Sequence, residues 1–271
     1  MSPFSLIRPA YSAAFRSGWI WLIQFLGNIA LFVLFVLWLR IPEAHFWQVA
    51  ASVLCAVGLL CGALVLHGGT LDYFRDRTAD GQACLGAAFG RAFRHVAAFA
   101  IWLFIAYVLW IQFNHLDAFS EQIPTFLRSE FPVWLRRLIT LNALENAYAA
   151  GQFVLQWIVA VGLLLPPALQ TANLGFRGFG KKGFAAWGRT IARLDYWIVV
   201  AIAALIGVWA ANWDLSWRPT GPNATPNMET VSLVLRLLLA YLLMIASWLT
   251  TCSMLGACAA RSGDSGGKPA A

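Results

Sequence analysis

The sequence predicts an all-α polytopic membrane bundle, and three observations carry this prediction. Of the 271 residues, 60% are hydrophobic and only 11% are charged, whereas soluble domains carry roughly 25% charged residues. Six apolar stretches approach or exceed the roughly 20 residues that a helix needs to cross a bilayer. Tryptophans gather near the ends of these stretches, as is typical of membrane–water interfaces. The remaining loops leave no room for a separate soluble catalytic domain.

The six spans are predicted at residues 19–39, 46–66, 96–113, 152–172, 196–213 and 231–256. The first stretch ends in Arg40-Ile41-Pro42 rather than in small residues, which indicates an uncleaved span and not a signal peptide. Residues 1–260 then form a single six-helix domain, and residues 261–271 form a disordered cytoplasmic tail.

The placement of lysine and arginine predicts the orientation. The two termini and the segments 67–95 and 173–195 together hold 13 basic residues, and the opposite side holds six. Because basic residues favour the cytoplasmic side, both termini are expected there, in what we take to be the bacterial inner membrane. The net charge of +7 fits such a surface. No basic run or stacking platform for nucleic acid is present.

A threefold repeat is indicated by three similar segments, each just before an odd-numbered span. They read Ala13-Ala14-Phe15-Arg16, Ala87-Ala88-Phe89-Gly90-Arg91 and Ala185-Ala186-Trp187-Gly188-Arg189. Each segment is expected to form a short amphipathic helix in the interface. The bundle would then consist of three helical hairpins, each preceded by such a helix.

Six spans with cytoplasmic amphipathic segments resemble a loose group of bacterial membrane domains. One member is the membrane domain found with glycerophosphodiester phosphodiesterases, and others have no assigned function. The resemblance covers most of the chain, but it lies in the Ala-Ala-aromatic-Gly-Arg segments and in topology. It therefore implies a fold and no site residue, and no catalytic phosphodiesterase domain is present.

The outer loop 114–151 is expected to contain helical structure. Pro124 and Pro132 can each open a helix. Beyond Pro132, apolar residues are expected to share one helix face: Trp134, Leu135, Leu138, Ile139 and Leu141. We interpret this segment as an interfacial helix on the outer leaflet, with a lid or a partner-docking surface as the alternative.

Polar residues gather at the cytoplasmic ends of the even-numbered spans. Pro166 and Pro167 remove two backbone donors, so the carbonyls a turn earlier need other partners. If the hairpins pack with pseudo-threefold symmetry, these ends meet in a cytoplasm-facing polar cavity. The alternative is a proline kink with serine and threonine joining packed helices. The candidate cavity residues are His67, Thr70, Asp72, Pro166, Pro167, Gln170, Asn173, Thr250, Thr251 and Ser253.

Five arginines are candidates for contact with lipid headgroups: Arg16, Arg91, Arg189, Arg193 and Arg236. Arg236 is the only clearly charged residue within a span. It lies close enough to the outer end of span 6 to extend toward the headgroups.

The sequence offers no convincing catalytic constellation. Asp72, Asp76 and Asp80 would share one helix face, but the further aspartates of membrane phosphotransferases are missing, and a solvated face is the simpler interpretation. The four histidines are scattered, and the five cysteines form no CxxC pair. No cofactor is expected.

Three function classes stay open. A non-enzymatic scaffold or accessory subunit is favoured, a permease or lipid-handling protein is the alternative, and an intramembrane enzyme comes last. The expected partners are membrane lipids and either another protein or a second copy of the chain.

Overall fold

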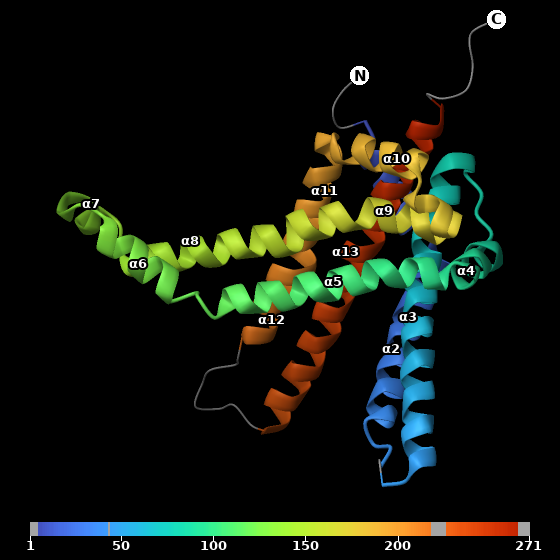
Figure 1. Ribbon diagram of the computed structural model, residues 1–271, viewed down its shortest axis with the longest axis horizontal. Coiled ribbons are helices and arrows are strands. Elements are labelled where there is room, and N and C mark those ends of the chain that lie inside the picture. Colours follow the sequence, from blue (N-terminus) through green and yellow to red (C-terminus); the bar gives the residue numbers. More distant parts are fainter. Residues whose placement is uncertain (1–4, 43, 218–225, 265–271) are drawn as a thin grey trace, which may run out of the picture.

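The computed structural model describes residues 5–42, 44–217 and 226–264, and the described residues are almost wholly helical (Figure 1). Within these residues, six helical segments are long and apolar enough to cross a membrane, which confirms the predicted all-α polytopic bundle. The helices are α1 (Ile7–Phe15), α2 (Gly18–Trp38), α3 (Phe46–Asp80), α4 (Leu85–Arg94), α5 (Val96–Asp117), α6 (Gln122–Glu130), α7 (Val133–Leu138), α8 (Leu141–Phe153), α9 (Val161–Leu174), α10 (Lys181–Ile191), α11 (Leu194–Ala204), α12 (Ala211–Ser216) and α13 (Pro226–Asp264). Two π-helical turns, η1 (Val154–Ala160) and η3 (Leu205–Ala210), and the 3₁₀ turn η2 (Gly175–Phe179) complete the helical elements of the described residues.

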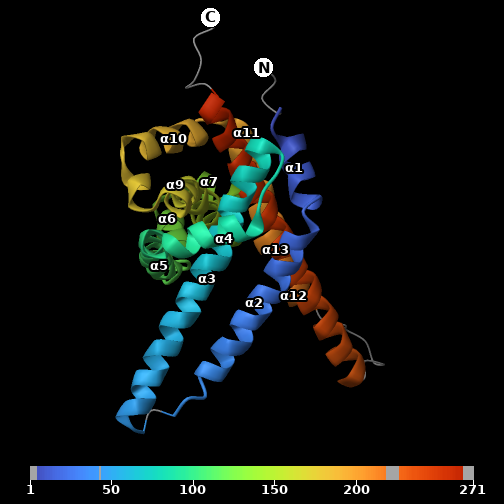
Figure 2. The same cartoon turned by 90° about the vertical axis from the view of Figure 1, so that its right-hand side faces the viewer.

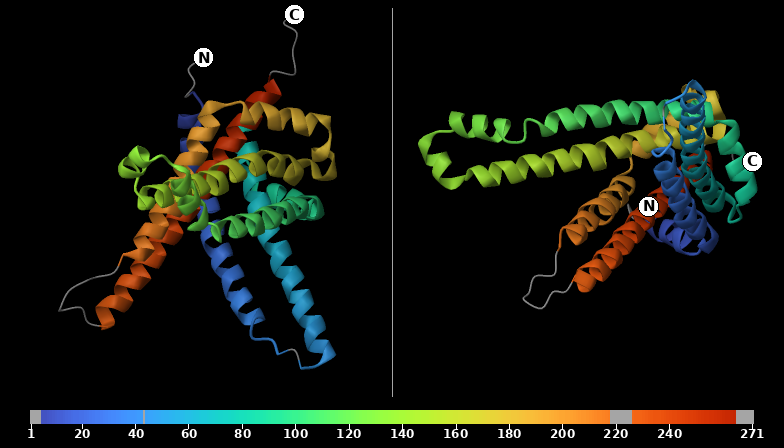
Figure 3. Two further views of the ribbon diagram at one scale, coloured as in Figure 1. Left: turned by 60° about the vertical axis from the view of Figure 1, so that its left-hand side comes forward. Right: turned by 90° about the horizontal axis from the view of Figure 1, so that it is seen from below.

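The spans form three hairpins: α2 with α3, α5 with the continuous segment α8–η1–α9, and α11–η3–α12 with α13. We call α3, α9 and α13 the second helices. The short helices α1, α4 and α10, which precede the hairpins, are called the leading helices. The hairpins meet at one end and diverge at the other, so that from below they point in three directions (Figure 3). The end where they meet is called the apex, and α1 and the end of α13 lie there (Figure 2).

The contacts at the apex follow a cyclic threefold pattern. The second helices α3, α9 and α13 contact one another. Each leading helix lies between the second helix of its own hairpin and that of the preceding one: α1 on α3 and α13, α4 on α9 and α3, and α10 on α13 and α9 (Figure 2). The first helices α2, α5 and α11 repeat this pattern of contacts. The hairpin repeat expected from the leading segments is therefore present in the tertiary structure.

Burial is concentrated at the apex. In α3, residues beyond Leu64 are largely buried, whereas most of residues 46–63 are exposed; α13 changes in the same way after Ala240. The distal halves carry exposed leucine, valine and phenylalanine, which in a membrane would face lipid. Tertiary packing therefore fixes the apical halves of the hairpins, and their distal halves diverge.

Two glycines let neighbouring helices pack closely at the apex. A Cβ on Gly256 of α13 would lie 2.4 Å from the carbonyl oxygen of Phe74 in α3. A Cβ on Gly69 of α3 would lie 2.8 Å from the ring of Phe89 in α4. Small residues let membrane helices approach this closely.

Helix bounds differ from the predicted spans where helices continue past the apolar stretches. α3 runs to Asp80, so residues 67–80, expected in a loop, are helical. The fourth span begins at Leu141, and α13 continues to Asp264, into the expected tail. Residues 265–271 of that tail lie outside the described residues. Hydropathy marks only the apolar part of a helix, whereas backbone hydrogen bonding continues through polar turns that tertiary contacts support.

The outer loop between α5 and α8 forms a helical arm, which consists of α6 and α7 at the distal end of the second hairpin (Figure 1). Pro124 lies in the first turn of α6, and Pro132 immediately precedes α7. The prediction that the apolar residues after Pro132 share one helix face is wrong. The helix is interrupted, because α7 ends at Leu138 and α8 begins at Leu141. Trp134 is 64% exposed and Leu138 is 73% exposed.

Candidate functional site

The three second helices share a threonine at one register position. Each threonine donates a hydrogen bond to the carbonyl oxygen four residues earlier: Thr70 to Leu66 (2.8 Å), Thr171 to Pro167 (3.2 Å) and Thr251 to Ser247 (2.8 Å). All three threonines are buried. When the helices are aligned on them, Asp72, Asn173 and Ser253 share the position two residues later. The sequence motif Thr-x-(Asp, Asn or Ser) therefore marks the apex of every hairpin.

Asp72 is the centre of a polar network that joins three elements. Its carboxylate accepts hydrogen bonds from Arg91 Nε of α4 (2.6 Å) and from Asn173 Nδ2 of α9 (2.9 Å), and its side chain is fully buried. Arg91 also pairs with Asp76, and Arg75 lies 3.5 Å from Asp72. A carboxylate buried in this way is stable only when it is paired and hydrogen-bonded.

Charge pairing also affects the arginine of this network. Burial lowers the pKa of the Arg91 guanidinium, but hydrogen bonding and charge attraction from Asp72 and Asp76 outweigh burial and raise it. A second pair follows α10, where Arg193 donates to both carboxylate oxygens of Asp195 at 3.0 and 2.8 Å. These hydrogen bonds raise the pKa of the Arg193 guanidinium. Both arginines stay cationic; Arg91 joins α4 to α3, whereas the Arg193–Asp195 pair is local to the start of α11.

The corresponding position in α13 makes a different contact. The Ser253 hydroxyl is fully buried and donates to the carbonyl oxygen of Ala10 in α1 at 2.7 Å. Asp72 and Ser253 therefore both bond to the leading helix of the next repeat in the cyclic order. Gln24 of α2 adds a bond to Thr70 and one to the Leu66 carbonyl oxygen (3.3 Å).

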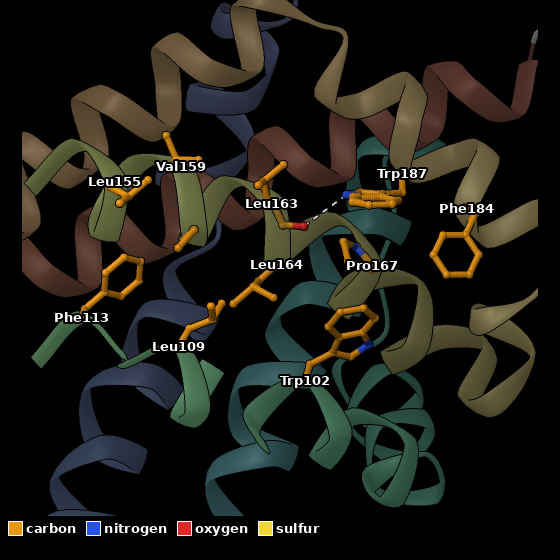
Figure 4. A pocket seen from close by; sticks show the side chains of 11 residues that line it. Trp102, Leu109, Phe113, Leu155, Val159, Leu163, Leu164, Pro167, Phe184 and Trp187 are labelled. Atoms are coloured by element: carbon orange, nitrogen blue, oxygen red, sulfur yellow. Dashed lines mark hydrogen bonds between the residues drawn. The ribbon is translucent and has the colours of Figure 1, made fainter. Parts of the chain in front are cut away.

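The proline pair of α9 forms a joint between the second and third repeats. Pro166 and Pro167 lack the N–H groups that would bond to the carbonyls of Gly162 and Leu163. The Gly162 oxygen instead accepts a hydrogen bond from the Tyr196 hydroxyl of α11 (2.8 Å). The Leu163 oxygen accepts one from the Trp187 indole of α10 (3.1 Å; Figure 4). Both freed carbonyls thus have protein partners, as the sequence requires.

An apolar cavity of about 320 Å³ lies between α5, η1–α9 and α10 (Figure 4). Trp102, Phe113, Val159, Leu164 and Trp187 are among its lining residues. The exposed side chains of Leu155, Leu163 and Phe184 stand at its margin. The Trp102 indole N–H is buried and has no hydrogen-bond partner among the described residues. Such a cavity is suited to an apolar chain.

The predicted cavity residues gather at the apex, mostly in packed surroundings. Thr70, Asp72, Thr250, Thr251 and Ser253 are buried. Pro166 and Pro167 are also buried, whereas His67, Gln170 and Asn173 are partly exposed. The His67 ring packs edge-on against Trp248 of α13, with 5.3 Å between centroids. The cytoplasm-facing polar cavity that we expected around these residues stays a prediction.

The five arginines predicted to contact headgroups differ in their hydrogen-bond and ion-pair partners. Arg91 and Arg193 pair with aspartates, and Arg236 bonds to the Leu215 carbonyl oxygen (3.3 Å) and that of Trp217, above the Trp217 ring. Arg16 and Arg189 are exposed, and Arg189 Nε bonds to the Ala185 carbonyl oxygen (3.2 Å). Headgroup contact by these five residues stays a prediction.

Two features of the apex could have been found from the sequence and were missed. One is the Thr-x-polar motif in all three second helices. The other is an aromatic residue at the fourth position of each first helix, namely Trp21, Phe99 and Trp197. The indoles of Trp21 and Trp197 donate to carbonyls at the ends of the preceding leading helices, Ala14 and Ile191.

No protein-family model, no curated protein and no solved structure matches the chain. The resemblance to bacterial six-span membrane domains therefore stays a prediction. Within the described residues, no group of three histidine, cysteine, aspartate or glutamate side chains is placed to hold a metal ion.

Proposed function

We propose that the chain is a non-enzymatic scaffold or accessory subunit of the bacterial inner membrane, with its apex and both termini in the cytoplasm. One observation carries the proposal. The carbonyls freed by Pro166 and Pro167 bond to Tyr196 and Trp187, so the proline-containing span is a fixed joint between repeats. In a transporter, such freed groups would face a substrate or an ion.

The polar network at the apex supports the same proposal. Asp72 and Ser253 use their oxygens to bond to neighbouring helices. Groups engaged in this way hold hairpins in place and are not free to bind a passing solute. A rigid apex would then present three diverging hairpins to the membrane.

The helical arm offers the surface for a protein partner. Phe126, Val133, Trp134 and Leu138 are strongly exposed along α6 and α7. Large exposed aromatic residues are typical anchors of protein interfaces. We expect a partner to contact the arm around Trp134.

Native mass spectrometry of the chain, released gently from its own membrane, tests the accessory-subunit role. A stoichiometric protein partner is expected to be lost from Trp134→Ala and retained by Trp47→Ala, a control in the first hairpin with similar exposure (66%). A chain without a partner, or a partner lost equally from both variants, contradicts the proposal.

A second candidate function is the handling of lipid or another apolar molecule, and the cavity in Figure 4 favours it. The same spectra then show a retained lipid without a protein partner. Val159→Phe, which fills the cavity, is expected to release that lipid. Val154→Phe, at an exposed position outside the cavity lining, is expected to keep it.

A further inference from the structure

A cavity of about 520 Å³ lies at the apex between α1, the end of α3 and the end of α13. Three arginines line it, one from each side: Arg16 just after α1, Arg77 of α3 and Arg261 of α13. No acidic residue is among the described residues that line it. Like charges brought together without counter-charge repel one another, which favours an anion between them.

Two of the three guanidinium groups have hydrogen-bond acceptors among the described residues. Arg77 donates to the Gly81 carbonyl oxygen (3.1 Å), and Arg261 donates to the Ser5 hydroxyl (2.8 Å). Both acceptors are uncharged. Within the described part of the chain, no ion pair involves any of the three arginines. Their charges are therefore not neutralised by the described residues.

The cavity lies at one of three equivalent corners, a corner being the place where a second helix contacts the leading helix of the next repeat. In the corner between α3 and α4, Arg91 pairs with Asp72 and Asp76 of the preceding second helix. At the same register positions, α13 has Ser253 and Ala257. Ser253 bonds to the α1 backbone, and Ala257 lines the cavity. Two carboxylates of one corner are thus replaced by an open volume beside three arginines.

We infer that the cavity lined by Arg16, Arg77 and Arg261 binds a phosphate group, which takes the place of the carboxylates found at the equivalent corner. Arginine binds phosphate through charge-assisted hydrogen bonds in a planar fork. Ser12 also lines the cavity and can add a hydroxyl donor. The group belongs either to an anionic phospholipid or to a soluble phosphate compound. This inference is independent of the proposed scaffold role.

The test uses the full chain in phosphatidylcholine nanodiscs, with thermal unfolding followed by tryptophan fluorescence. One arm adds inorganic phosphate at constant ionic strength, and the other replaces part of the phosphatidylcholine with phosphatidylglycerol. Stabilisation by inorganic phosphate identifies a soluble ligand. Stabilisation by phosphatidylglycerol alone identifies a lipid headgroup. No stabilisation in either arm overturns the inference.

Variants separate the cavity from general surface charge. Arg77→Gln and Arg261→Gln are expected to weaken apparent affinity about tenfold or more, because each removes a charged hydrogen bond. Arg8→Gln is the matched control, since it removes an exposed charge from α1 outside the cavity lining. Equal weakening in Arg8→Gln overturns the inference.

Ala257→Asp provides a test that does not depend on losing an arginine. It restores a carboxylate at the register position of Asp76 and is expected to raise the melting temperature without ligand. The stabilisation by phosphate or phosphatidylglycerol should then largely disappear. A variant that stays as responsive as the wild type contradicts an anion site at this corner.

Discussion

Removal of the Tyr196 hydroxyl is the sharpest test of the proline joint. Tyr196 is fully buried, and its hydroxyl donates to the Gly162 oxygen, which Pro166 leaves without an intrahelical partner. Tyr196→Phe deletes this donor and little else. A buried acceptor without a partner costs about 1–3 kcal/mol, and interhelical hydrogen bonds in membranes have measured values of about 0.6 to 1.7 kcal/mol. We therefore expect a loss of about 1–2 kcal/mol in the free energy of unfolding.

A second substitution shows whether the cost arises from the proline. Pro166→Ala restores an N–H group that can bond to the Gly162 oxygen within the helix. In this background, Tyr196→Phe should cost less than about 0.5 kcal/mol, because the acceptor is already satisfied. The double-mutant cycle cancels the packing cost of Pro166→Ala itself.

The assay is equilibrium unfolding by SDS titration, supported by melting temperatures, which should fall by about 2–4 °C per kcal/mol for a chain of this size. Tyr241→Phe is the control, since its hydroxyl bonds to the Phe25 carbonyl oxygen (2.6 Å), away from the prolines. Its cost should be the same in both backgrounds. An equal cost of Tyr196→Phe with and without Pro166 would refute the reasoning.

Three further predictions concern the apex and its orientation. Asp72→Asn should lower the free energy of unfolding by about 3 kcal/mol, because it breaks a buried ion pair. Asp76→Asn should cost clearly less, since the side chain of Asp76 is 27% exposed. Similar losses for both variants in SDS titration would argue against Asp72 as the centre of the network. Gly256→Ala should lower the free energy of unfolding by about 1–3 kcal/mol, because the added Cβ forces α13 away from the Phe74 carbonyl. In the control Gly58→Ala the added Cβ meets nothing within 4 Å, so this variant should be neutral or stabilise by up to about 1 kcal/mol. SDS titration tests both variants. Cys84, which is exposed at the apex, should react with a membrane-impermeant maleimide only after spheroplasts are permeabilised. Cys84→Ser is the control. Labelling of Cys84 in intact spheroplasts would contradict the expected cytoplasmic position of the apex.

The sequence was sufficient to predict the fold class. It was also sufficient to predict that the carbonyls freed by the proline pair need other hydrogen-bond donors. Six apolar stretches leave few alternatives to spanning helices, since a helix satisfies its own backbone in lipid. Pro166 and Pro167 predict two carbonyls that need donors for the same local reason. The identity of those donors, Tyr196 and Trp187, could not be predicted, because both come from the next repeat.

The candidate site shows the same division. Thr70, Asp72, Asn173, Thr251 and Ser253 were all selected from the sequence, and the structure brings their helices together at the apex. That Asp72 lies between Arg91 and Asn173 depends on contacts across 19 and 101 residues of sequence. The three-arginine cavity was not expected, since Arg16, Arg77 and Arg261 are far apart in the sequence.

By itself, the sequence determined the spans, the leading helices and the local consequences of each proline, because hydropathy and backbone hydrogen bonding act over neighbouring residues. Only the tertiary structure decided which polar groups form hydrogen bonds or ion pairs with one another and which charged groups lack a counter-charge among the described residues. It pairs Arg91 with two aspartates at one corner of the threefold arrangement and leaves three arginines around an open volume at another. The physical reason is that the cost of a buried or clustered charge depends on its spatial neighbours, and these are set by helix packing.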